Sequence, residues 1–572
     1  MRCVAAILLA VSGTLVTAQQ PARPQPPSTL RAPTRAEALR GEYGRYRSNN
    51  DLLHYDLDVR VDPEKKWISG RNTVRFKMLK DDTRIQLDLF ANLNIDRILL
   101  DHTALTYQRD INTVYIDFPQ RLRSGRTYAI EFYYSGSPLE VGRFDALAFK
   151  KDPAGNHWIN SANEGVGSAV WWPSKDSWQD EPTGMDIRVA IPSDLINVSN
   201  GRFMEKTDLG DGYTKWHYRV HYPINSYNVS LNIAKYAHFG EQMGDLTLDY
   251  YVLPGSLEGA KRQFAQSKGM IEAFERFFGE YPFKKDGFKL IEVPYSGMEH
   301  QSAVTYGNRF SNGYLGRDWT GVGISMKFDF IIIHESAHEW FGNAVSAADQ
   351  ADMWIHEGFA TYLECLYVEH TFGYDDYLKY TNGYKTKIAN KEPIIIQRGI
   401  ARDPNQDMYF KGALFLHTLR SVVNDLSRRG GAAADDTQWF KLLRDLYAEF
   451  KYKNNFSEEI VAFVSRQLGH DMTPIFDQYL RRADLPVLEL TFNDEDKTVW
   501  YRWNAAERGF AMPIRVGDPA KWQTIQPSAD WKSMPWTSSK DAFKVATDLY
   551  YVNVQVLGAN GWKPEPTVGA GL

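Results

Sequence analysis

Residues 331–343 read Ile-Ile-Ile-His-Glu-Ser-Ala-His-Glu-Trp-Phe-Gly-Asn, and this short segment decides how the fold of the 572-residue chain is interpreted. It contains an H-E-x-x-H pattern, which three apolar residues precede and a Gly-Asn pair, typical of a helix end, follows. Residues four apart share one face of a helix, so His334 and His338 can turn their imidazoles to one metal ion while Glu335 stands beside them. The segment therefore predicts a metal site on a helix.

A second helix, expected to begin near Asp352, supplies the third ligand, because 18 residues separate His338 from Glu357. Two neutral imidazoles and one carboxylate leave the fourth position of Zn²⁺ open for water, which is typical of a catalytic site. Bound water reaches a pKa of about 7, and Glu335 is the expected base that takes its proton. Glu364, two turns beyond Glu357, is expected either to orient a ligand histidine or to face solvent.

The composition is that of a globular protein with several domains. It is 43% hydrophobic and 24% charged, which excludes a disordered chain, a collagen and a small disulfide scaffold. Lys and Arg number 66 against 71 Asp and Glu, a formal net charge of -5. This balance gives no basic excess that would indicate nucleic acid or anionic lipid as a partner.

The N-terminus has the pattern of a secretory signal peptide over residues 1–18. Its apolar run, Val4 to Val16, is too short for a bilayer of roughly 30 Å, and small residues precede a cleavage point after Ala18. We expect an exported, periplasmic or secreted protein without stable membrane insertion; a retained N-terminal anchor is the alternative. Cleavage leaves one cysteine, Cys365, expected to be buried and inert.

Changes in periodicity divide the rest of the chain. A Pro-rich linker is expected over residues 19–45. Alternating short strands predict a β-domain over residues 46–245, helical patterns dominate residues 246–483, and residues 484–572 return to strand patterns. The expected fold class is multidomain α+β, with an N-terminal β-sheet domain, a mainly helical catalytic domain and a small C-terminal β-domain.

The motifs resemble those of the zinc aminopeptidase (gluzincin) family that includes aminopeptidase N and leukotriene hydrolase. His334 to Asn343 resembles its H-E-x-x-H-x-W-F-G-N motif, and Trp354 to Ala360 resembles W-x-N-E-G-F-A. Pro294 to His300 is similar to the exopeptidase motif P-x-G-x-M-E-N, and Tyr409 to Gly412 is similar to Y-x-K-G. The motifs occur in family order, and the resemblance runs from about residue 50 to the C-terminus.

The resemblance implies a thermolysin-like catalytic domain, with the active site where the first two domains meet. It assigns Glu299 as the main anchor of the substrate amine, with Glu164 as a second anchor; taken alone, either residue could form a surface salt bridge. It assigns Tyr409 as the hydroxyl donor to the reacting carbonyl oxygen, although a core tyrosine is the alternative. Three further residues could line the cleft or simply pack: Tyr295, Gly297 and Met298.

Three positions depart from the family pattern. Ser296 replaces the first Gly of the exopeptidase motif, His300 replaces its Asn, and His356 replaces the Asn that precedes Glu357. The C-terminal portion is also shorter than the large helical domain of long family members. We therefore expect a more open active site with its own substrate geometry.

The sequence predicts an exported zinc aminopeptidase, with one zinc ion per chain, that acts on peptides. An endopeptidase or an epoxide hydrolase is the alternative among zinc hydrolases. A non-catalytic peptide-binding homologue is the alternative from another class, and the presence of both Glu335 and Tyr409 disfavours it.

Overall fold

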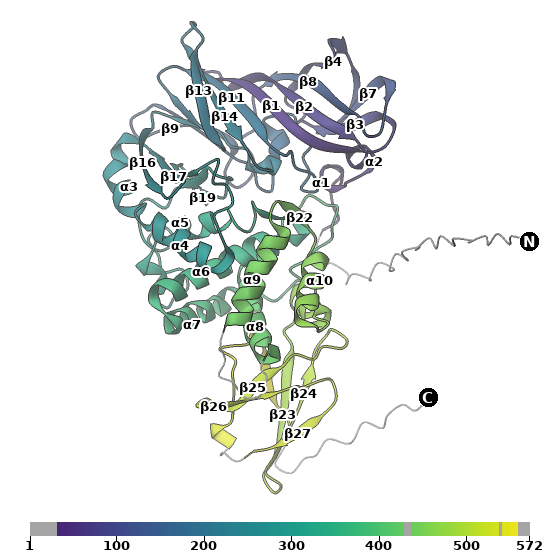
Figure 1. The fold of residues 1–572 in the computed structure, drawn as a ribbon, viewed down its shortest axis with the longest axis vertical. Helices are drawn as coiled ribbons and strands as arrows, with labels where there is room; N and C mark the ends of the chain where they lie inside the picture. Colours follow the sequence, from purple (N-terminus) through teal and green to yellow (C-terminus); the bar gives the residue numbers. More distant parts are fainter. Residues whose placement is uncertain (1–30, 428–435, 537–539, 559–572) are drawn as a thin grey trace, which may run out of the picture. The chain divides into compact units, whose positions relative to one another are not determined.

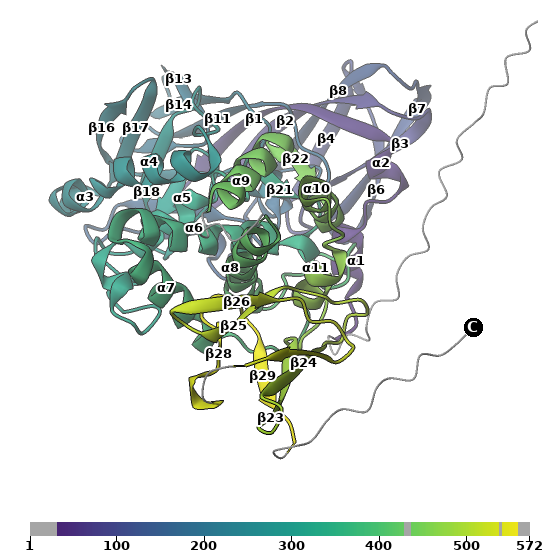
Figure 2. The same ribbon diagram turned by 60° about the horizontal axis from the view of Figure 1, so that its bottom comes forward.

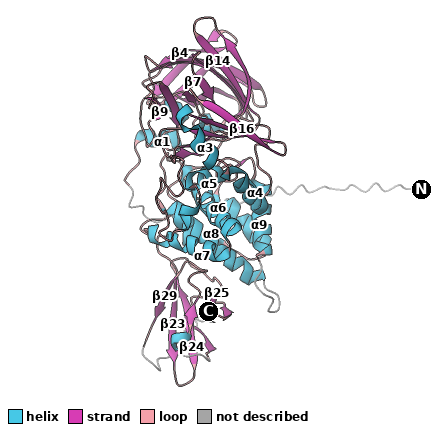
Figure 3. Cartoon of the chain, turned by 90° about the vertical axis from the view of Figure 1, so that its left-hand side faces the viewer, coloured by secondary structure: helices cyan, strands magenta, loops and turns pink. Residues whose placement is uncertain are grey.

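The computed structural model describes residues 31–427, 436–536 and 540–558 (Figure 1). The expected signal peptide and residues 19–30 of the expected linker lie outside the described residues, so their interpretation stays a prediction. Within the described ranges, no helix is both long enough and apolar enough to cross a membrane. The chain runs from a strand-rich region through a helical region to a second strand-rich region, which confirms the multidomain α+β prediction (Figure 3).

The N-terminal region is built on an eight-stranded sheet with the order β13-β14-β11-β1-β2-β8-β4-β5. Strand β1 (Asn50–Asp62) is antiparallel to β2 (Trp67–Met78) and parallel to β11 (Met185–Pro192). The alternation in β1 buries every second side chain, as its sequence pattern predicts: Tyr55, Leu57, Val59 and Val61. The remaining strands are β4 (Asn94–Leu100), β5 (Thr103–Ala104), β8 (Thr127–Gly136), β13 (Arg202–Asp208) and β14 (Tyr213–Val220).

Two smaller sheets complete this region, and one hydrophobic core joins them to the large sheet. The first has the order β3-β7-β6, formed by β3 (Asp82–Asp88), β6 (Thr106–Asp110) and β7 (Thr113–Leu122). The second has the order β12-β15-β10-β9, formed by β9 (Ala146–Lys151), β10 (His157–Ala162), β12 (Ile196–Val198) and β15 (Asn232–Ala234). The turn after β10 carries Glu164.

The structure differs from the predicted linker at helix α1 (Arg35–Gly41), which the short helix α2 (Arg45–Ser48) follows. Thr34 and Glu37 form a capping box, in which each side chain accepts a hydrogen bond from the other residue's backbone N–H. Arg40 donates from Nη1 to two backbone carbonyls, at 2.7 Å to Gly165 and at 2.6 Å to the next residue. The second half of the expected spacer is therefore a capped helix that contacts the turn after Glu164.

The helical region begins with a five-stranded sheet of the order β16-β17-β18-β20-β19. Its first strand, β16 (Ala237–Met243), starts before residue 246, where the sequence places the domain boundary. The other strands are β17 (Leu246–Val252), β18 (Phe288–Glu292), β19 (Gly297–Met298) and β20 (Val304–Tyr306). Strand β19 lies at the edge of this sheet, next to the helix that carries the H-E-x-x-H pattern.

Helices α3 (Leu257–Gln263) and α4 (Gln266–Phe278) account for the first helical pattern, and Gly279 ends it with φ 116°. The metal-binding segments lie on α5 (Phe330–Ala337) and α6 (Trp354–Phe372), while α8 (Asp407–Ser427) packs along α6. The other elements of this region are α7 (Tyr374–Gly383), α9 (Thr437–Phe450), α10 (Ser457–Leu468), α11 (Thr473–Leu480) and the parallel strand pair β21 (Val345–Ala347) and β22 (Lys453–Asn455).

The C-terminal region contains two sheets, with the orders β27-β24-β23-β29 and β26-β25-β28. Its strands are β23 (Val487–Asn493), β24 (Thr498–Asn504), β25 (Ile514–Asp518), β26 (Lys521–Ile525), β27 (Lys532–Pro535), β28 (Lys544–Val545) and β29 (Asn553–Val556). This region packs against α8 (Figure 2), where Arg515 of β25 donates to Asp425 at 2.9 Å. The C-terminal sheets and the helices thus share one continuous hydrophobic core.

Candidate active site

Helix α5 carries the H-E-x-x-H pattern, and Asp329 fixes where this helix begins. The Asp329 carboxylate accepts two backbone N–H groups of the first turn, at 3.1 and 3.2 Å, which is a helix N-cap. The helix ends at Ala337, and His338 continues the helical backbone at the C-cap position with φ -62°. His334 and His338 therefore lie one turn apart, as the sequence pattern predicts.

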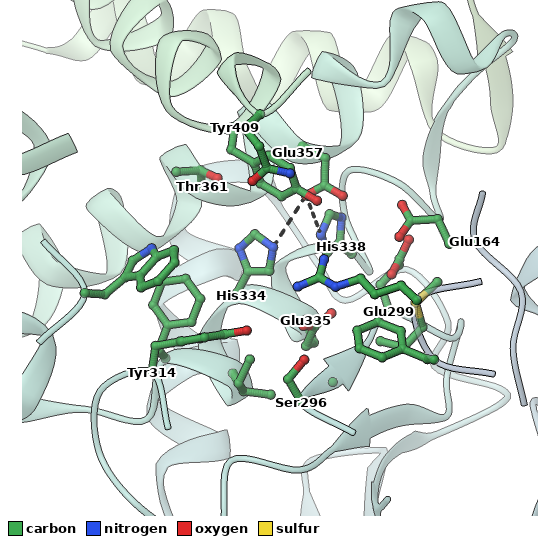
Figure 4. A pocket seen from close by; sticks show the side chains of 18 of the residues that line it. Glu164, Ser296, Glu299, Tyr314, His334, Glu335, His338, Glu357, Thr361 and Tyr409 are labelled. Atoms are coloured by element: carbon green, nitrogen blue, oxygen red, sulfur yellow. Dashed lines mark ion pairs between the residues drawn. The ribbon is translucent and has the colours of Figure 1, made fainter. Parts of the chain in front are cut away.

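The three expected metal ligands converge on one point. Glu357, in the first turn of α6, places Oε2 at 3.5 Å from Nε2 of His334 and at 3.4 Å from Nε2 of His338 (Figure 4). One ligand atom from each of the three residues lies within 4.8 Å of the others, and all three side chains are buried. A cation can lie among them with each residue supplying one ligand.

The chemistry of these donors fits zinc. Two imidazoles and one carboxylate form the donor set of a catalytic zinc site. Oε2 of Glu357 is buried and has no hydrogen-bond partner among the described residues, as expected for an oxygen that serves a cation. Burial opposes ionisation of Glu357, but the neighbouring His338 and His334 lower the pKa of its carboxyl below the ordinary value.

Hydrogen bonds behind the two histidines fix the direction of their rings. Nδ1 of His334 is 2.6 Å from Glu364, and Nδ1 of His338 is 3.0 Å from the carbonyl oxygen of Phe341. With the proton on Nδ1, each Nε2 lone pair faces Glu357. Glu364 is fully buried, so it orients His334 and is not on a solvated helix face.

Glu335 lies beside the ligands on the same helix, and Gly297 of β19 packs directly against its carboxylate. Burial raises the pKa of Glu335 to about 7; the charge of His334 opposes this shift and that of Glu299 adds to it. Glu335 also lines the pocket that holds the three ligands. Its carboxyl group is therefore placed for proton transfer at the point where the ligands converge.

Two further carboxylates line the same pocket, Glu299 after β19 and Glu164 after β10. Glu299 is buried and accepts the hydroxyl of Tyr227 at 3.0 Å, while Oε1 of Glu164 has no hydrogen-bond partner. Burial raises the pKa of Glu164 well above its ordinary value, and the charge of Glu299 raises it further. Among the described residues neither carboxylate pairs with a Lys or an Arg, so the surface salt bridges considered from sequence are absent. The two groups form an acidic end of the pocket, and an ammonium ion bound between them would favour their ionised forms.

Tyr409 lies in the first turn of α8 and contacts the metal ligands. Its ring stacks near His334, with centroids 6.1 Å apart and an interplanar angle of 26°. The side chain lines the pocket and is only partly buried, unlike a core tyrosine. Figure 4 shows Tyr409 on the side of Glu357, across the two histidines from Glu335. This position leaves its hydroxyl available to a substrate.

Some residues of the segment around β19 line the pocket, and one packs behind it. Ser296, Gly297 and Met298 line the pocket, but Tyr295 does not. The Tyr295 hydroxyl donates to the carbonyl oxygen of Ser161 at 3.0 Å, and its ring stacks on Phe144, 4.9 Å away. Tyr295 therefore packs behind Phe144 and not into the pocket. The sequence could not distinguish lining from packing, because the segment mixes polar and apolar residues without a clear period.

The two histidines that replace Asn in the family motifs are both buried packing residues. His356 accepts the backbone N–H of Ala347 through Nε2 at 2.8 Å, and its ring stacks on Trp178 with centroids 5.0 Å apart. Neither nitrogen of His300 has a partner among the described residues, and burial lowers its pKa to about 3. Neither His300 nor His356 lines the pocket. Both side chains pack behind the residues that line it.

Sequence reasoning missed a part of the pocket wall. The missed residues come from a loop of the N-terminal region, from the loop before α5, from helices α5, α6 and α8, and from the turn before α8: Arg143, Phe144, Tyr314, Trp319, Phe330, Thr361, Gln406 and Phe410. Phe330 lies one helical turn before His334, and Phe410 lies inside the Y-x-K-G segment, so their positions relative to the motifs are a usable signal. Tyr314 and Trp319 lie in an irregular loop without a motif or a period, so no pattern marks them.

Comparisons with known proteins agree with this site. The Peptidase family M1 domain matches residues 262–479, and the Peptidase M1 N-terminal domain matches residues 52–228. A leucyl aminopeptidase of Saccharolobus solfataricus is 24% identical over 285 residues, 47% of this chain and 34% of the relative. Endoplasmic reticulum aminopeptidase 1 of Mus musculus is 23% identical over 321 residues, 53% of this chain and 33% of the relative. The chain thus spans about a third of the length of these curated relatives.

A solved structure shows the same fold over most of the chain. The crystal structure of an M1 zinc metallopeptidase from Deinococcus radiodurans aligns with a TM-score of 0.61 and 22% identity, covering 76% of this chain and 93% of that chain. A related crystal structure of that metallopeptidase is described as bound to a Tyr-Ser-Ala substrate, with a TM-score of 0.60 and coverage of 76% of this chain and 94% of that chain.

Proposed function

Because the chain belongs to the peptidase M1 family, we propose that it is a zinc aminopeptidase that hydrolyses the first peptide bond of peptides with a free N-terminal amine. The names of the curated relatives support this activity over the segments that match. One observation carries the proposal: Glu299 and Glu164 line the same pocket as the metal ligands, and neither forms an ion pair with a Lys or an Arg in the part of the chain that the structure describes. A pair of buried carboxylates next to the metal ligands suits an enzyme that recognises a free amine.

The reaction is a hydrolysis in which the chain supplies proton transfer. Zinc held by His334, His338 and Glu357 supplies Lewis-acid chemistry, which polarises a carbonyl and lowers the pKa of water. The Glu335 carboxylate takes a proton from the attacking water as the O–C bond forms. It gives this proton to the leaving nitrogen as the C–N bond breaks. The products are a free amino acid and a peptide shortened by one residue.

Tyr409 stabilises the charge that develops on the carbonyl oxygen. Its hydroxyl has no hydrogen-bond partner among the described residues, and its ring is fixed against His334. A donor held in this way interacts more strongly with an oxyanion than with the neutral carbonyl of the ground state. The O–H of Tyr409 therefore lowers the barrier without tightening substrate binding to the same extent.

Glu299 and Glu164 bind the substrate amine at a fixed distance from the metal ligands. The α-amine of a peptide lies one residue from the bond that is cut, so an anchor at a fixed place selects that bond and no other. Charge-assisted hydrogen bonds from an ammonium group to two carboxylates are strong where the carboxylates are buried. Binding of the free amine at these two carboxylates thus restricts cleavage to the first peptide bond, which is the activity of an exopeptidase.

We also propose that the protein is exported, with cleavage after Ala18. This proposal is supported by the apolar run and the small residues of positions 1–18. Determination of the mature N-terminus by mass spectrometry tests it: Gln19 as the first residue agrees with export, whereas a retained Met1 contradicts it.

The proposed activity is tested with short peptides offered in two forms, with a free and with an acetylated N-terminus. The purified protein is assayed with zinc, after removal of the metal with 1,10-phenanthroline, and after return of zinc. We expect zinc-dependent cleavage confined to the free forms. Equal cleavage of both forms would contradict the proposal in favour of an endopeptidase. Absence of cleavage with zinc bound would favour the epoxide hydrolase or a binding protein.

A further inference from the structure

The end of the pocket formed by the loop before α5 is aromatic. Four rings build it, and we call them the aromatic wall: Tyr314, Trp319, Phe330 and Phe410. The ring centroids of Tyr314 and Trp319 are 4.6 Å apart, and those of Tyr314 and Phe330 are 5.5 Å apart at 90°. Trp319 also contacts Phe410, at 6.2 Å. These rings form one continuous apolar surface.

The aromatic wall is attached to the metal site and is open to the pocket. Phe330 stacks on His334, with ring centroids 5.5 Å apart and an interplanar angle of 13°. Phe330 is largely buried, whereas Tyr314 and Trp319 are only half-buried and keep part of their rings accessible. Figure 4 shows the hydroxyl of Tyr314 directed into the pocket, and no described residue pairs with it.

The loop that carries the wall is held in place by its own hydrogen bonds. The side-chain amide of Asn308 donates to the carbonyl oxygen of Gly313 and to Asp329, at 2.8 Å each. The backbone N–H of Trp319 donates to Ser325 at 2.7 Å. Because these bonds order the loop before any ligand arrives, binding against the wall loses little conformational entropy.

The two ends of the pocket differ in chemistry, and the metal ligands lie between them. Figure 4 shows Glu164 and Glu299 at one end and Tyr314 at the other, with His334 and His338 in between. A peptide whose amine is at the carboxylates and whose first carbonyl is at the metal ligands continues away from the carboxylates, and the aromatic wall lies on that side. Its second residue, whose Cα is about 3.8 Å beyond the first, comes next to His334 and the wall.

We infer that the aromatic wall is the subsite for the second residue of the substrate, and that it selects an apolar and above all an aromatic side chain. This inference rests on the proposed aminopeptidase function. An aromatic side chain gains edge-to-face and stacked contacts with the rings of the wall. A charged side chain loses hydration against these rings, and Nζ of Lys387 already lies 3.8 Å from the centroid of the Trp319 ring, which disfavours a second cation there. The chain therefore selects substrates by the residue it releases as the new N-terminus.

Dipeptide amides that share the first residue test the inference. Leucyl-phenylalanine amide, leucyl-alanine amide and leucyl-glutamate amide differ only at the second side chain. We expect kcat/KM to be about tenfold or more higher for phenylalanine than for alanine, since burial of one aromatic side chain supports a ratio of that order. Glutamate, which brings no ring to the wall, is expected to fall below phenylalanine as well.

Variants of the aromatic wall test whether these rings cause the ratio of kcat/KM between the phenylalanine and alanine amides. Trp319→Ala and Tyr314→Ala are expected to bring the phenylalanine-to-alanine ratio close to one, whereas Tyr314→Phe keeps the ring and is expected to keep the ratio. Trp67→Ala, at a 38% exposed Trp of β2, serves as the matched control and should leave the ratio unchanged.

The outcomes separate this inference from the proposed function. Equal kcat/KM for the three amides, with cleavage still confined to free N-termini, would overturn the aromatic subsite and leave the aminopeptidase intact. Cleavage of N-acetylated forms at equal rates would instead contradict the aminopeptidase. The substrate series needs no variant, so poor folding of one protein does not affect the result.

Discussion

Gly297 and Glu335 lie so close that a β-carbon added to Gly297 would come within 2.8 Å of a carboxylate oxygen of Glu335 and 2.9 Å of its Cγ. The methyl group of Ile331 would be nearer still, at 2.7 Å. Real β-carbons essentially never approach other atoms below 3.0 Å, so the edge strand β19 fixes one side of the space that Glu335 occupies.

Gly297→Ala is therefore expected to displace Glu335 without removing any metal ligand. A misplacement of about 1 Å costs on the order of 100-fold in rate, so kcat should fall by roughly that factor while bound zinc stays at one per chain. Steady-state kinetics and metal analysis check this. Gly269→Ala on α4 is the matched control, because nothing lies within 4 Å of its added carbon. A normal kcat in Gly297→Ala would show that Glu335 tolerates movement.

Glu335→Gln should keep zinc and lose turnover. The amide keeps the size of the side chain but cannot accept the proton of the attacking water, and loss of a general base typically costs about 10²–10⁴-fold in kcat. Single-turnover kinetics with a free-amine peptide measures the loss. Glu272→Gln, on the exposed face of α4, provides a control of the same chemistry. Near-normal turnover would contradict the assignment of Glu335 as the base.

Tyr409→Phe should lower kcat by about 10²–10³-fold, which is the usual effect of removing one donor to an oxyanion. KM is expected to change little, because the hydroxyl acts mainly in the transition state. Tyr374→Phe removes a hydroxyl from a 45% exposed tyrosine and should leave both constants unchanged. A large rise in KM with normal kcat would show that Tyr409 binds the ground state instead.

Glu299→Ala should chiefly damage the recognition of free N-termini. We expect the ratio of kcat/KM for free against acetylated peptides to fall by about tenfold or more, because a charge-assisted hydrogen bond to a buried carboxylate is lost. The measurement is this ratio and not activity alone, so partial inactivation does not imitate the effect. An unchanged ratio would leave Glu164 as the sole anchor.

Acid should lower the stability of the fold through His417 of α8. Burial lowers the pKa of His417 to about 4. Its Nε2 donates to the carbonyl oxygen of Asp548 at 2.8 Å, so an added proton goes to Nδ1, which accepts the hydroxyl of Tyr377 at 2.7 Å in the neutral ring. The folded pKa lies below the unfolded value of about 6.5, so the unfolded chain binds more protons between these two pH values. Stability should therefore fall as pH drops from about 6.5 to 4, by up to about 1.4 kcal/mol per pH unit.

His417→Gln removes this titration and keeps a polar side chain between α8 and Asp548. Unfolding in urea, measured from pH 4 to pH 7, should show a smaller loss of stability toward acid in the variant than in the original protein. Parallel curves for the two proteins would contradict the role of His417.

The metal site could be predicted from the sequence because its geometry is local. His334, Glu335 and His338 share one helix, and Glu357 lies in the first turn of the helix that follows the intervening loop and strand. The spacing of a regular helix sets which side chains share a face, so few sets of residues could bind one metal ion. Glu299 needed the family motif, since a strand and a loop bring it to the ligands.

The aromatic wall and helix α1 could not be predicted in the same way. Tyr314 and Trp319 reach the pocket through an irregular loop whose course depends on the Asn308 hydrogen bonds, and no periodic pattern encodes such a course. For α1 the proline content of the preceding residues indicated a spacer. The Thr34 and Glu37 capping box was the signal that argued otherwise.

Helix α1, the first helix among the described residues, contacts the turn that carries one of the proposed amine anchors. Arg40 donates a hydrogen bond to the turn that follows Glu164. The residues proposed to bind zinc and to hydrolyse the peptide bond lie on α5, α6 and α8 or directly after α5. One of the two proposed amine anchors, Glu164, thus lies in a different region of the chain from the proposed hydrolytic residues, whereas Glu299 lies close to them, after β19. Sequence change near the first helix can alter which amines are accepted while the hydrolytic machinery stays as it is, and selectivity can evolve independently of catalysis.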